Sequence, residues 1–218
     1  MISNIYPSIL DANPIQLPKL LADFKNNGVK GLHVDVMDGV YVPTIGFSEK
    51  FVKWLSQNTE FYLDLHLMVT DSEKVIEFFS GINIGGITIH LNTSTNLFYV
   101  VDHLKKLGIN PGVALNPEEN PELIKPLLPF LHHVLVMTAN PGRPSHGVIP
   151  EMTQKISWLK EYRKEHNLKF KIQTDGGVAA NNAGMLKMAG CDEFISGGYL
   201  IKATNLKKNL ELLSEVIS

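Results

Sequence analysis

Short apolar runs and longer amphipathic stretches alternate eight times along this sequence of 218 residues. The apolar runs carry few charges, which is typical of strands in a parallel sheet that is buried on both faces. Parallel strands need crossover connections, and helices usually supply them. The alternation therefore predicts an α/β fold with a parallel sheet. The expected strands cover residues 5–10, 31–36, 61–67, 85–90, 111–115, 133–137, 170–174 and 193–196.

The stretches between these runs have helical spacing. In 17–28, leucines and a phenylalanine stand three or four residues apart, and Gly28 fits the end of that helix. In 120–131, Pro126 and Pro129 are expected to shorten or distort the helix, because proline lacks the N–H group that a helix needs. The other expected helices cover 48–57, 72–81, 95–108, 151–165, 181–190 and 206–217.

Eight strand–helix units match a (β/α)₈ TIM barrel, and 218 residues is close to the lower size of about 200 for that fold. The alternative is a doubly wound open sheet. That fold should carry a glycine fingerprint after its first strand, and PSILDAN carries none. The sequence has no linker or low-complexity tract, so we expect one barrel domain over residues 1–218.

Charge and cysteine content narrow the class of protein. The 20 basic and 22 acidic residues give a net charge of -2, which indicates no nucleic-acid partner and no membrane surface. Every apolar stretch is shorter than the roughly 18–20 residues that cross a bilayer, and MISNIYPSIL does not resemble a signal peptide. Cys191 is the single cysteine, so no internal disulfide can form. These features predict a cytoplasmic protein.

In TIM barrels the active-site groups come from the carboxyl ends of the strands and the loops that follow them. Several polar residues and glycines occupy those positions here. They are Ser8, His33, Asp35, Asp38, Asp64, His66, His90, Asn140, Asp175, Gly176, Gly177, Gly197 and Gly198.

His33 and Asp35 stand two apart in a strand, so their side chains point the same way. If that direction is the barrel interior, both meet His66 and Asp175. Two imidazoles and two carboxylates suit a divalent metal such as zinc, iron, manganese or cobalt, without discriminating among them. A strand histidine is more often a structural group than a ligand, whereas an unpaired buried carboxylate is costly. Spacing alone leaves both interpretations open.

Several stretches together resemble the ribulose-phosphate 3-epimerase family. They follow the family's order and spacing over nearly the whole chain, and they read PSILDAN, HVDVMDGVYVP, LDLHLMV, ITIH, VALNP, VLVMTANPG, TDGGVAANN and AGCDEFISGG. The resemblance implies a barrel of the ribulose-phosphate-binding type. It also implies an isomerase of the pentose phosphate pathway that inverts C3 of a ketose phosphate, by default between D-ribulose 5-phosphate and D-xylulose 5-phosphate.

The resemblance also implies roles for individual residues. His33, Asp35, His66 and Asp175 would bind one divalent metal ion, and Asp35 and Asp175 would also be the acid/base pair. Ser8 and His66 would contact the substrate, and three methionines would surround the reacting carbon, although core filling explains methionines equally well. The methionines are Met37, Met68 and Met137, and the remaining expected substrate contacts are Gly142, Arg143, Gly176, Gly177, Gly197 and Gly198.

The sequence departs from the family where a phosphate would bind. The usual NPGFGGQ is NPGRPSH here, residues 140–146, and the usual Gly-Ser after the last strand is Gly197–Gly198, which lacks the hydroxyl. Arg143 could supply charge in place of the lost donors, and the glycine amides could still bind an anion. We therefore expect a sugar-phosphate ligand and, as in the family, a homo-oligomer. The alternatives are another ketose or ketose phosphate, such as D-allulose 6-phosphate, and a non-catalytic barrel that binds a sugar phosphate.

Overall fold

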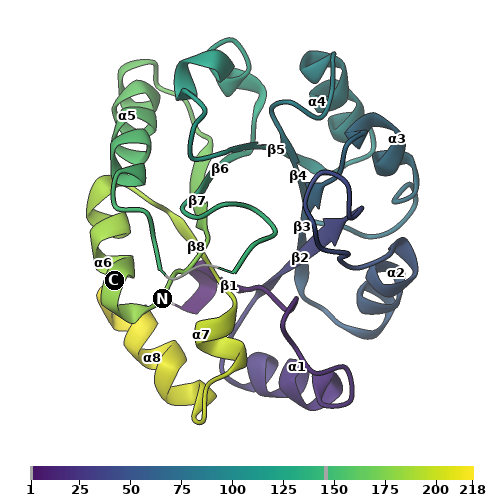
Figure 1. Ribbon diagram of the computed structural model, residues 1–218, viewed down its shortest axis with the longest axis vertical. Coiled ribbons are helices and arrows are strands. Elements are labelled where there is room, and N and C mark those ends of the chain that lie inside the picture. The colour runs from purple at the N-terminus through teal and green to yellow at the C-terminus, as the bar shows by residue number, and fades with distance from the viewer. Residues whose placement is uncertain (1, 145–146) are drawn as a thin grey trace.

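The computed structural model describes residues 2–144 and 147–218, and these form a nearly closed barrel of eight parallel strands (Figure 1). The strands pair in the order β1-β8-β7-β6-β5-β4-β3-β2, and a parallel bridge between Ser8 and His33 joins the two ends of the sheet. The predicted (β/α)₈ TIM barrel is thus confirmed. The strands are β1 (Ile5–Pro7), β2 (Gly31–Met37), β3 (Tyr62–Met68), β4 (Gly86–His90), β5 (Asn110–Leu115), β6 (His133–Met137), β7 (Lys171–Asp175) and β8 (Glu193–Ser196).

Helices surround the strands and pack their apolar faces against the outer side of the barrel (Figure 1). In α1, for example, Leu17, Leu21 and Phe24 are buried, as the spacing predicts. The α-helices are α1 (Leu17–Asn26), α2 (Glu49–Asn58), α3 (Ser72–Glu77), α4 (Leu97–Lys106), α5 (Met152–Glu165), α6 (Ala180–Ala189), α7 (Gly198–Ile201) and α8 (Leu206–Val216).

Two segments differ from regular strand–helix alternation. Residues 120–131 form two short 3₁₀ turns, η2 (Pro121–Ile124) and η3 (Leu128–Phe130), as expected for a stretch interrupted by prolines. The single-turn helix α7 directly after β8 is absent from the sequence-based prediction, because four residues are too few to show apolar periodicity. A third 3₁₀ turn, η1 (Ile2–Asn4), precedes β1.

The barrel interior is unusually polar at the end where the strands begin. Tyr6 Oη donates to Glu193 Oε1 at 3.2 Å, and Gln173 Nε2 donates to Glu193 Oε2 at 2.9 Å. Lys171 forms an ion pair with the same carboxylate. Branched aliphatic side chains usually fill this space in TIM barrels. Here a paired carboxylate and its donors fill it, so the buried charge of Glu193 is compensated.

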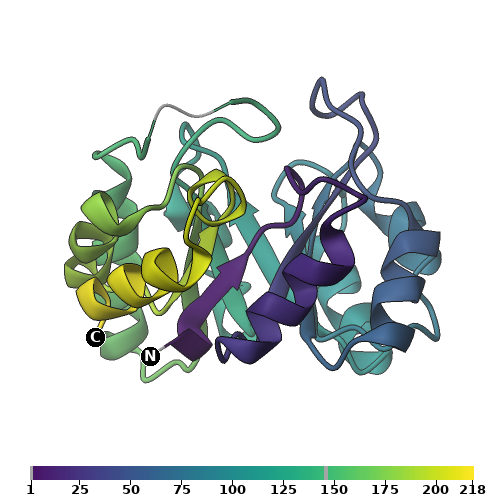
Figure 2. The same ribbon diagram turned by 90° about the horizontal axis from the view of Figure 1, so that it is seen from below.

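The carboxyl ends of the strands share one edge of the barrel. The side view shows the loop after β2, the loop after β6 and helix α7 at this edge, whereas the N-terminus lies at the other (Figure 2). None of the helices in residues 2–144 and 147–218 has the length and apolar character needed to cross a membrane.

Candidate active site

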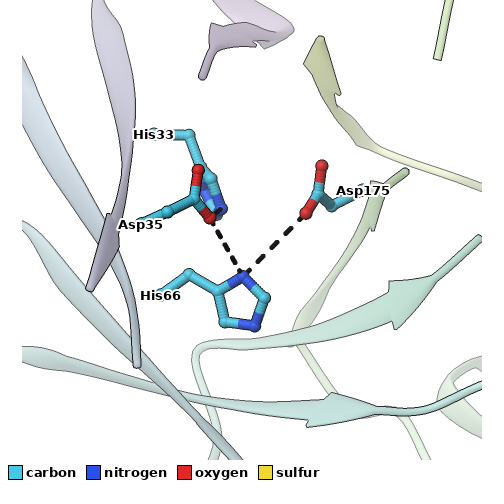
Figure 3. A group of neighbouring side chains, drawn as sticks. All are labelled: His33, Asp35, His66 and Asp175. Carbon is cyan, nitrogen blue, oxygen red and sulfur yellow. Dashed lines mark ion pairs between the residues drawn. The ribbon is translucent and has the colours of Figure 1, made fainter. Parts of the chain in front are cut away.

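Strand register brings four predicted residues together. Asp35 on β2 is the register partner of His66 on β3, and Asp175 ends β7. One ligand atom each from His33, Asp35, His66 and Asp175 lies within 4.8 Å of the others. In Figure 3 the four side chains converge, with Asp35 and Asp175 on opposite sides of the imidazole of His66. The side chains of His33 and Asp35 therefore point into the barrel, as expected.

The distances within this cluster suit a shared cation. Asp35 Oδ1 lies 3.4 Å from His33 Nε2 and 3.5 Å from His66 Nδ1, and His66 Nδ1 lies 3.9 Å from Asp175 Oδ2. Ligand atoms about 2.1 Å from one ion lie about 3.4 Å apart in a tetrahedral arrangement. Among the described residues, the two imidazole nitrogens have no hydrogen-bond partner although both are buried. Such unsatisfied nitrogens are costly unless an ion uses them, so these residues fit a divalent metal.

Two further buried residues determine which nitrogen each histidine presents. His33 Nδ1 lies 2.9 Å from Asp64 Oδ2, so this nitrogen would keep its proton when a metal binds, and Nε2 would be the one to lose its proton and offer a lone pair. His66 Nε2 lies 2.8 Å from His90 Nε2, and burial together with the charge of His66 lowers the pKa of His90 well below its usual value. A neutral His90 can accept the proton of His66 Nε2–H. Both metal-facing nitrogens are thereby left free to coordinate.

The two carboxylates of the cluster lie in different electrostatic environments. Burial opposes ionisation of Asp35, but the neighbouring His33 and His66 outweigh it and hold its pKa well below the usual range. Burial raises the pKa of Asp175; the charge of His33 opposes that rise, and the charge of Asp35 adds to it. Ser8 Oγ donates to Asp35 Oδ2 at 2.7 Å and orients it. The pair thus combines an anionic carboxylate with one that binds a proton more readily.

A cavity of about 560 Å³ opens above Asp35 and Asp175. His33 and His66 are completely buried beneath it and are not part of its lining. The other residues predicted from sequence do line it, namely Ser8, Met37, Met68, Met137, Gly142, Arg143, Gly176, Gly177, Gly197 and Gly198. Ser145 and His146 of the altered loop 140–146 lie outside the described residues.

The cavity lining also contains two charged residues that the sequence analysis missed, Lys202 and Asp11. Lys202 Nζ lies 2.6 Å from Asp11 Oδ2, and both residues line the cavity. Lys202 follows Gly198 by four residues, and neighbours on a helix have this spacing. That spacing was the sequence signal that Lys202 lies close to Gly198. No hydrogen bond of the described residues uses the N–H group of Gly177 or Gly197.

Asp64 and His90 were visible as polar strand residues but received no role from the sequence. Asp64 stands two residues before His66, as His33 stands two before Asp35, so the same alternation places Asp64 inside the barrel.

Asp38 has a different function. It accepts hydrogen bonds from the N–H groups of Tyr41 and Thr70, which ties the loop after β2 to the end of β3.

Comparison with known proteins agrees with the geometry. The model of the Ribulose-phosphate 3 epimerase family matches residues 4–201. Ribulose-phosphate 3-epimerase of Helicobacter pylori strain J99 is 34% identical over 212 residues, which cover 97% of each chain. The enzyme of the same name from Synechocystis is 32% identical over 203 residues, or 92% of this chain and 88% of that one.

A solved structure extends the agreement to the fold. The structure of 3-hexulose-6-phosphate synthase from Salmonella typhimurium superposes with a TM-score of 0.74, covering 98% of each chain. At 11% identity this likeness concerns the fold alone. The family match and the full-length relatives go further. They show that the chain belongs to the ribulose-phosphate 3-epimerase family, isomerases that act on carbohydrates.

Proposed function

We propose that this chain is a metal-dependent epimerase that inverts C3 of a ketose phosphate, with D-ribulose 5-phosphate and D-xylulose 5-phosphate as its substrate pair. The observation that carries the proposal is the buried cluster of His33, Asp35, His66 and Asp175 at the floor of a cavity. Two carboxylates there flank two imidazole nitrogens that lack partners among the described residues.

His33, Asp35, His66 and Asp175 would hold the divalent metal, and zinc, iron, manganese and cobalt all suit this donor set. When bound, the cation stabilises the negative charge that develops as a proton leaves the carbon beside a ketone. Asp64 and His90 keep the two imidazoles in the required tautomers. A cation at this position also lowers the pKa of both carboxylates.

Inversion at a carbon requires that a proton leave one face and another arrive on the opposite face. Asp35 and Asp175 come from β2 and β7 and lie on opposite sides of the cluster (Figure 3). In one direction the anionic Asp35 takes the proton and Asp175 delivers one, and in the other direction the roles exchange. The hydrogen bond from Ser8 holds Asp35 in place for both steps.

Met37, Met68 and Met137 supply an apolar wall next to the carboxylates. Their flexible thioether chains can follow the contour of a sugar while limiting the access of water to the reacting carbon. We further propose that residues 1–218 act as one barrel domain in a cytoplasmic homo-oligomer of the pentose phosphate pathway, as expected of the family.

The decisive experiment measures epimerisation and C3 proton exchange by the metal-loaded protein over a panel of ketose phosphates and free ketoses in deuterated water. We expect the fastest turnover with the D-ribulose 5-phosphate pair, accompanied by deuterium at C3. Faster turnover of D-allulose 6-phosphate would instead assign the chain to that substrate. Binding of sugar phosphates without any C3 exchange would contradict catalysis and favour a binding barrel.

A further inference from the structure

A chain of polar groups runs from His66 away from the metal cluster. Its first link is the contact of 2.8 Å between His66 Nε2 and His90 Nε2. His90 is completely buried, and a neutral imidazole carries a single proton. His90 can therefore accept the His66 proton at Nε2 only if its own proton is on Nδ1. That buried Nδ1 makes no hydrogen bond of regular geometry to a described residue, so it needs an acceptor nearby.

Asn116, directly after β5, supplies such an acceptor. His90 is the register partner of Ala114, and Asn116 follows Ala114 by two residues, so strand alternation directs it to the same interior face. Its Oδ1 atom is buried and likewise lacks a regular partner among the described residues. Burial and the charge of His66 lower the pKa of His90, and a hydrogen bond with Asn116 opposes them. The donor and the acceptor without regular partners thus belong to neighbouring side chains.

The hydroxyl group of Tyr41 decides which way the Asn116 carboxamide points. The ring of Tyr41 lies against His90, with centroids 4.9 Å apart, and Tyr41 Oη donates to Asn92 Oδ1 at 3.0 Å. Because its one proton is then used, Tyr41 Oη accepts from Asn116 Nδ2, also at 3.0 Å. The NH₂ group of Asn116 is thus turned to Tyr41, and its oxygen remains for His90.

The backbone of Asn116 is held on both sides. Glu119 Oε2 accepts from its N–H group at 2.7 Å, and Lys155 Nζ on α5 donates to its carbonyl oxygen at 2.7 Å. Lys155 also donates to the carbonyl oxygen of Pro117 at 2.7 Å. These contacts fix the position from which the carboxamide reaches into the barrel.

We propose that Asn116 is a positioning residue for the metal site, because its carboxamide, oriented by Tyr41, keeps the proton of His90 on Nδ1. His90 Nε2 then accepts from His66 Nε2–H, and His66 Nδ1 retains the lone pair that a divalent cation needs. A reversed carboxamide would reverse each later link and place a proton on His66 Nδ1. The inference rests on the metal site of the proposed function and deepens it.

Asn116→Leu removes both amide groups at similar side-chain shape, and Tyr41→Phe removes only the hydroxyl group that orients them. The matched controls are Asn58→Leu, at an exposed asparagine of α2, and Tyr99→Phe, at an exposed tyrosine of α4 that also stacks on a histidine. Zinc alone is the probe, and its dissociation constant is measured by competition with a chromophoric chelator at pH 8. We expect Asn116→Leu to weaken zinc binding about tenfold, Tyr41→Phe to weaken it by a smaller factor, and the controls to bind as the wild type does.

Nitrogen-15 NMR of the histidine-labelled protein supplies a readout that a purely structural role would not move. We expect the wild type to carry the His90 proton on Nδ1 before and after zinc is added. Metal-free Asn116→Leu should show a second form of His90 that is protonated at Nε2. Tyr41→Phe keeps the ring against His90, so it tests the same chain without changing the packing of the barrel.

A wild-type His90 protonated at Nε2 would overturn the proposal, as would wild-type zinc affinity in both Asn116→Leu and Tyr41→Phe. The zinc measurement needs no substrate, which separates this inference from the proposed function. If zinc affinity depends on Asn116 but no ketose phosphate is epimerised, the proposed function fails and the positioning role stands.

Discussion

The four-residue cluster and the rest of the cavity lining are built from different parts of the fold. In the cluster, His33, Asp35 and His66 are at most 4% exposed and come from strands whose register determines their separation. In the rest of the lining, Lys202 is 69% exposed and Arg143 belongs to a loop. The comparison indicates that the rigid sheet fixes the cluster, while the loop part of the lining can change without disturbing it.

The sharpest test of the four-residue cluster replaces one of its carboxylates. Asp35→Asn or Asp175→Asn should lower kcat by about a thousandfold or more, because one of the two proton-transfer groups is lost. Asp102→Asn, on an exposed residue of α4, is the control and should leave kcat unchanged. Circular dichroism would verify the fold, and near-normal turnover in either cluster variant would contradict the assigned roles.

Metal removal tests the same cluster without mutation. A chelator should abolish turnover, and a divalent ion should restore it. Burial opposes protonation of His33, but Asp35 and Asp64 raise its pKa well above the usual value in the metal-free protein. The cation must then displace a proton, so metal affinity should fall by about tenfold per pH unit below that pKa. Competition with a chromophoric chelator at pH 6 and pH 8 measures this, and pH-independent affinity would argue against His33 as a ligand.

Asp64→Asn tests whether the carboxylate that contacts His33 Nδ1 contributes to metal affinity. The amide cannot supply the negative charge that stabilises His33 Nδ1–H, so metal affinity should fall by roughly 10–100-fold. Measuring the metal dissociation constant directly keeps this readout independent of turnover. An unchanged constant, with Asp102→Asn again as the control, would restrict Asp64 to a role in packing.

The smallest expected effect is a loss of stability on changing Asp38 in the loop after β2. Asp38→Ala removes the acceptor for the N–H groups of Tyr41 and Thr70 and should lower the free energy of unfolding by about 1 kcal/mol. Slight burial raises the pKa of Asp38, but these N–H groups lower it below 3.8. Its stabilisation is therefore complete above that value and is lost as pH falls through the folded-state pKa.

Denaturant unfolding of Asp38→Ala and the wild type at pH 7 and near pH 2 measures this dependence, and the difference should shrink in acid. Glu161→Ala on the exposed side of α5 is the control. A loss of turnover in Asp38→Ala as large as that in the carboxylate variants would erase the distinction between the strand-held cluster and the loops.

The cluster of His33, Asp35, His66 and Asp175 could be predicted because the sequence pattern that marks it is local and periodic. Alternation within β2 places His33 and Asp35 on one face, β3 carries His66 near its carboxyl end, and β7 ends with Asp175. Asp64 and His90 carried the same signal. They received no role, because a hydrogen bond between strands depends on register, which one strand's sequence does not contain.

The sequence by itself determined the eightfold strand–helix alternation, the family resemblance and the four residues of the cluster. Only the tertiary structure decided which imidazole nitrogens lack partners among the described residues, and it alone placed Lys202 beside Asp11. The physical reason is range. Apolar periodicity and strand alternation act between residues a few positions apart, whereas Asp11 and Lys202 meet only because the closing barrel brings the loop after β1 next to α7.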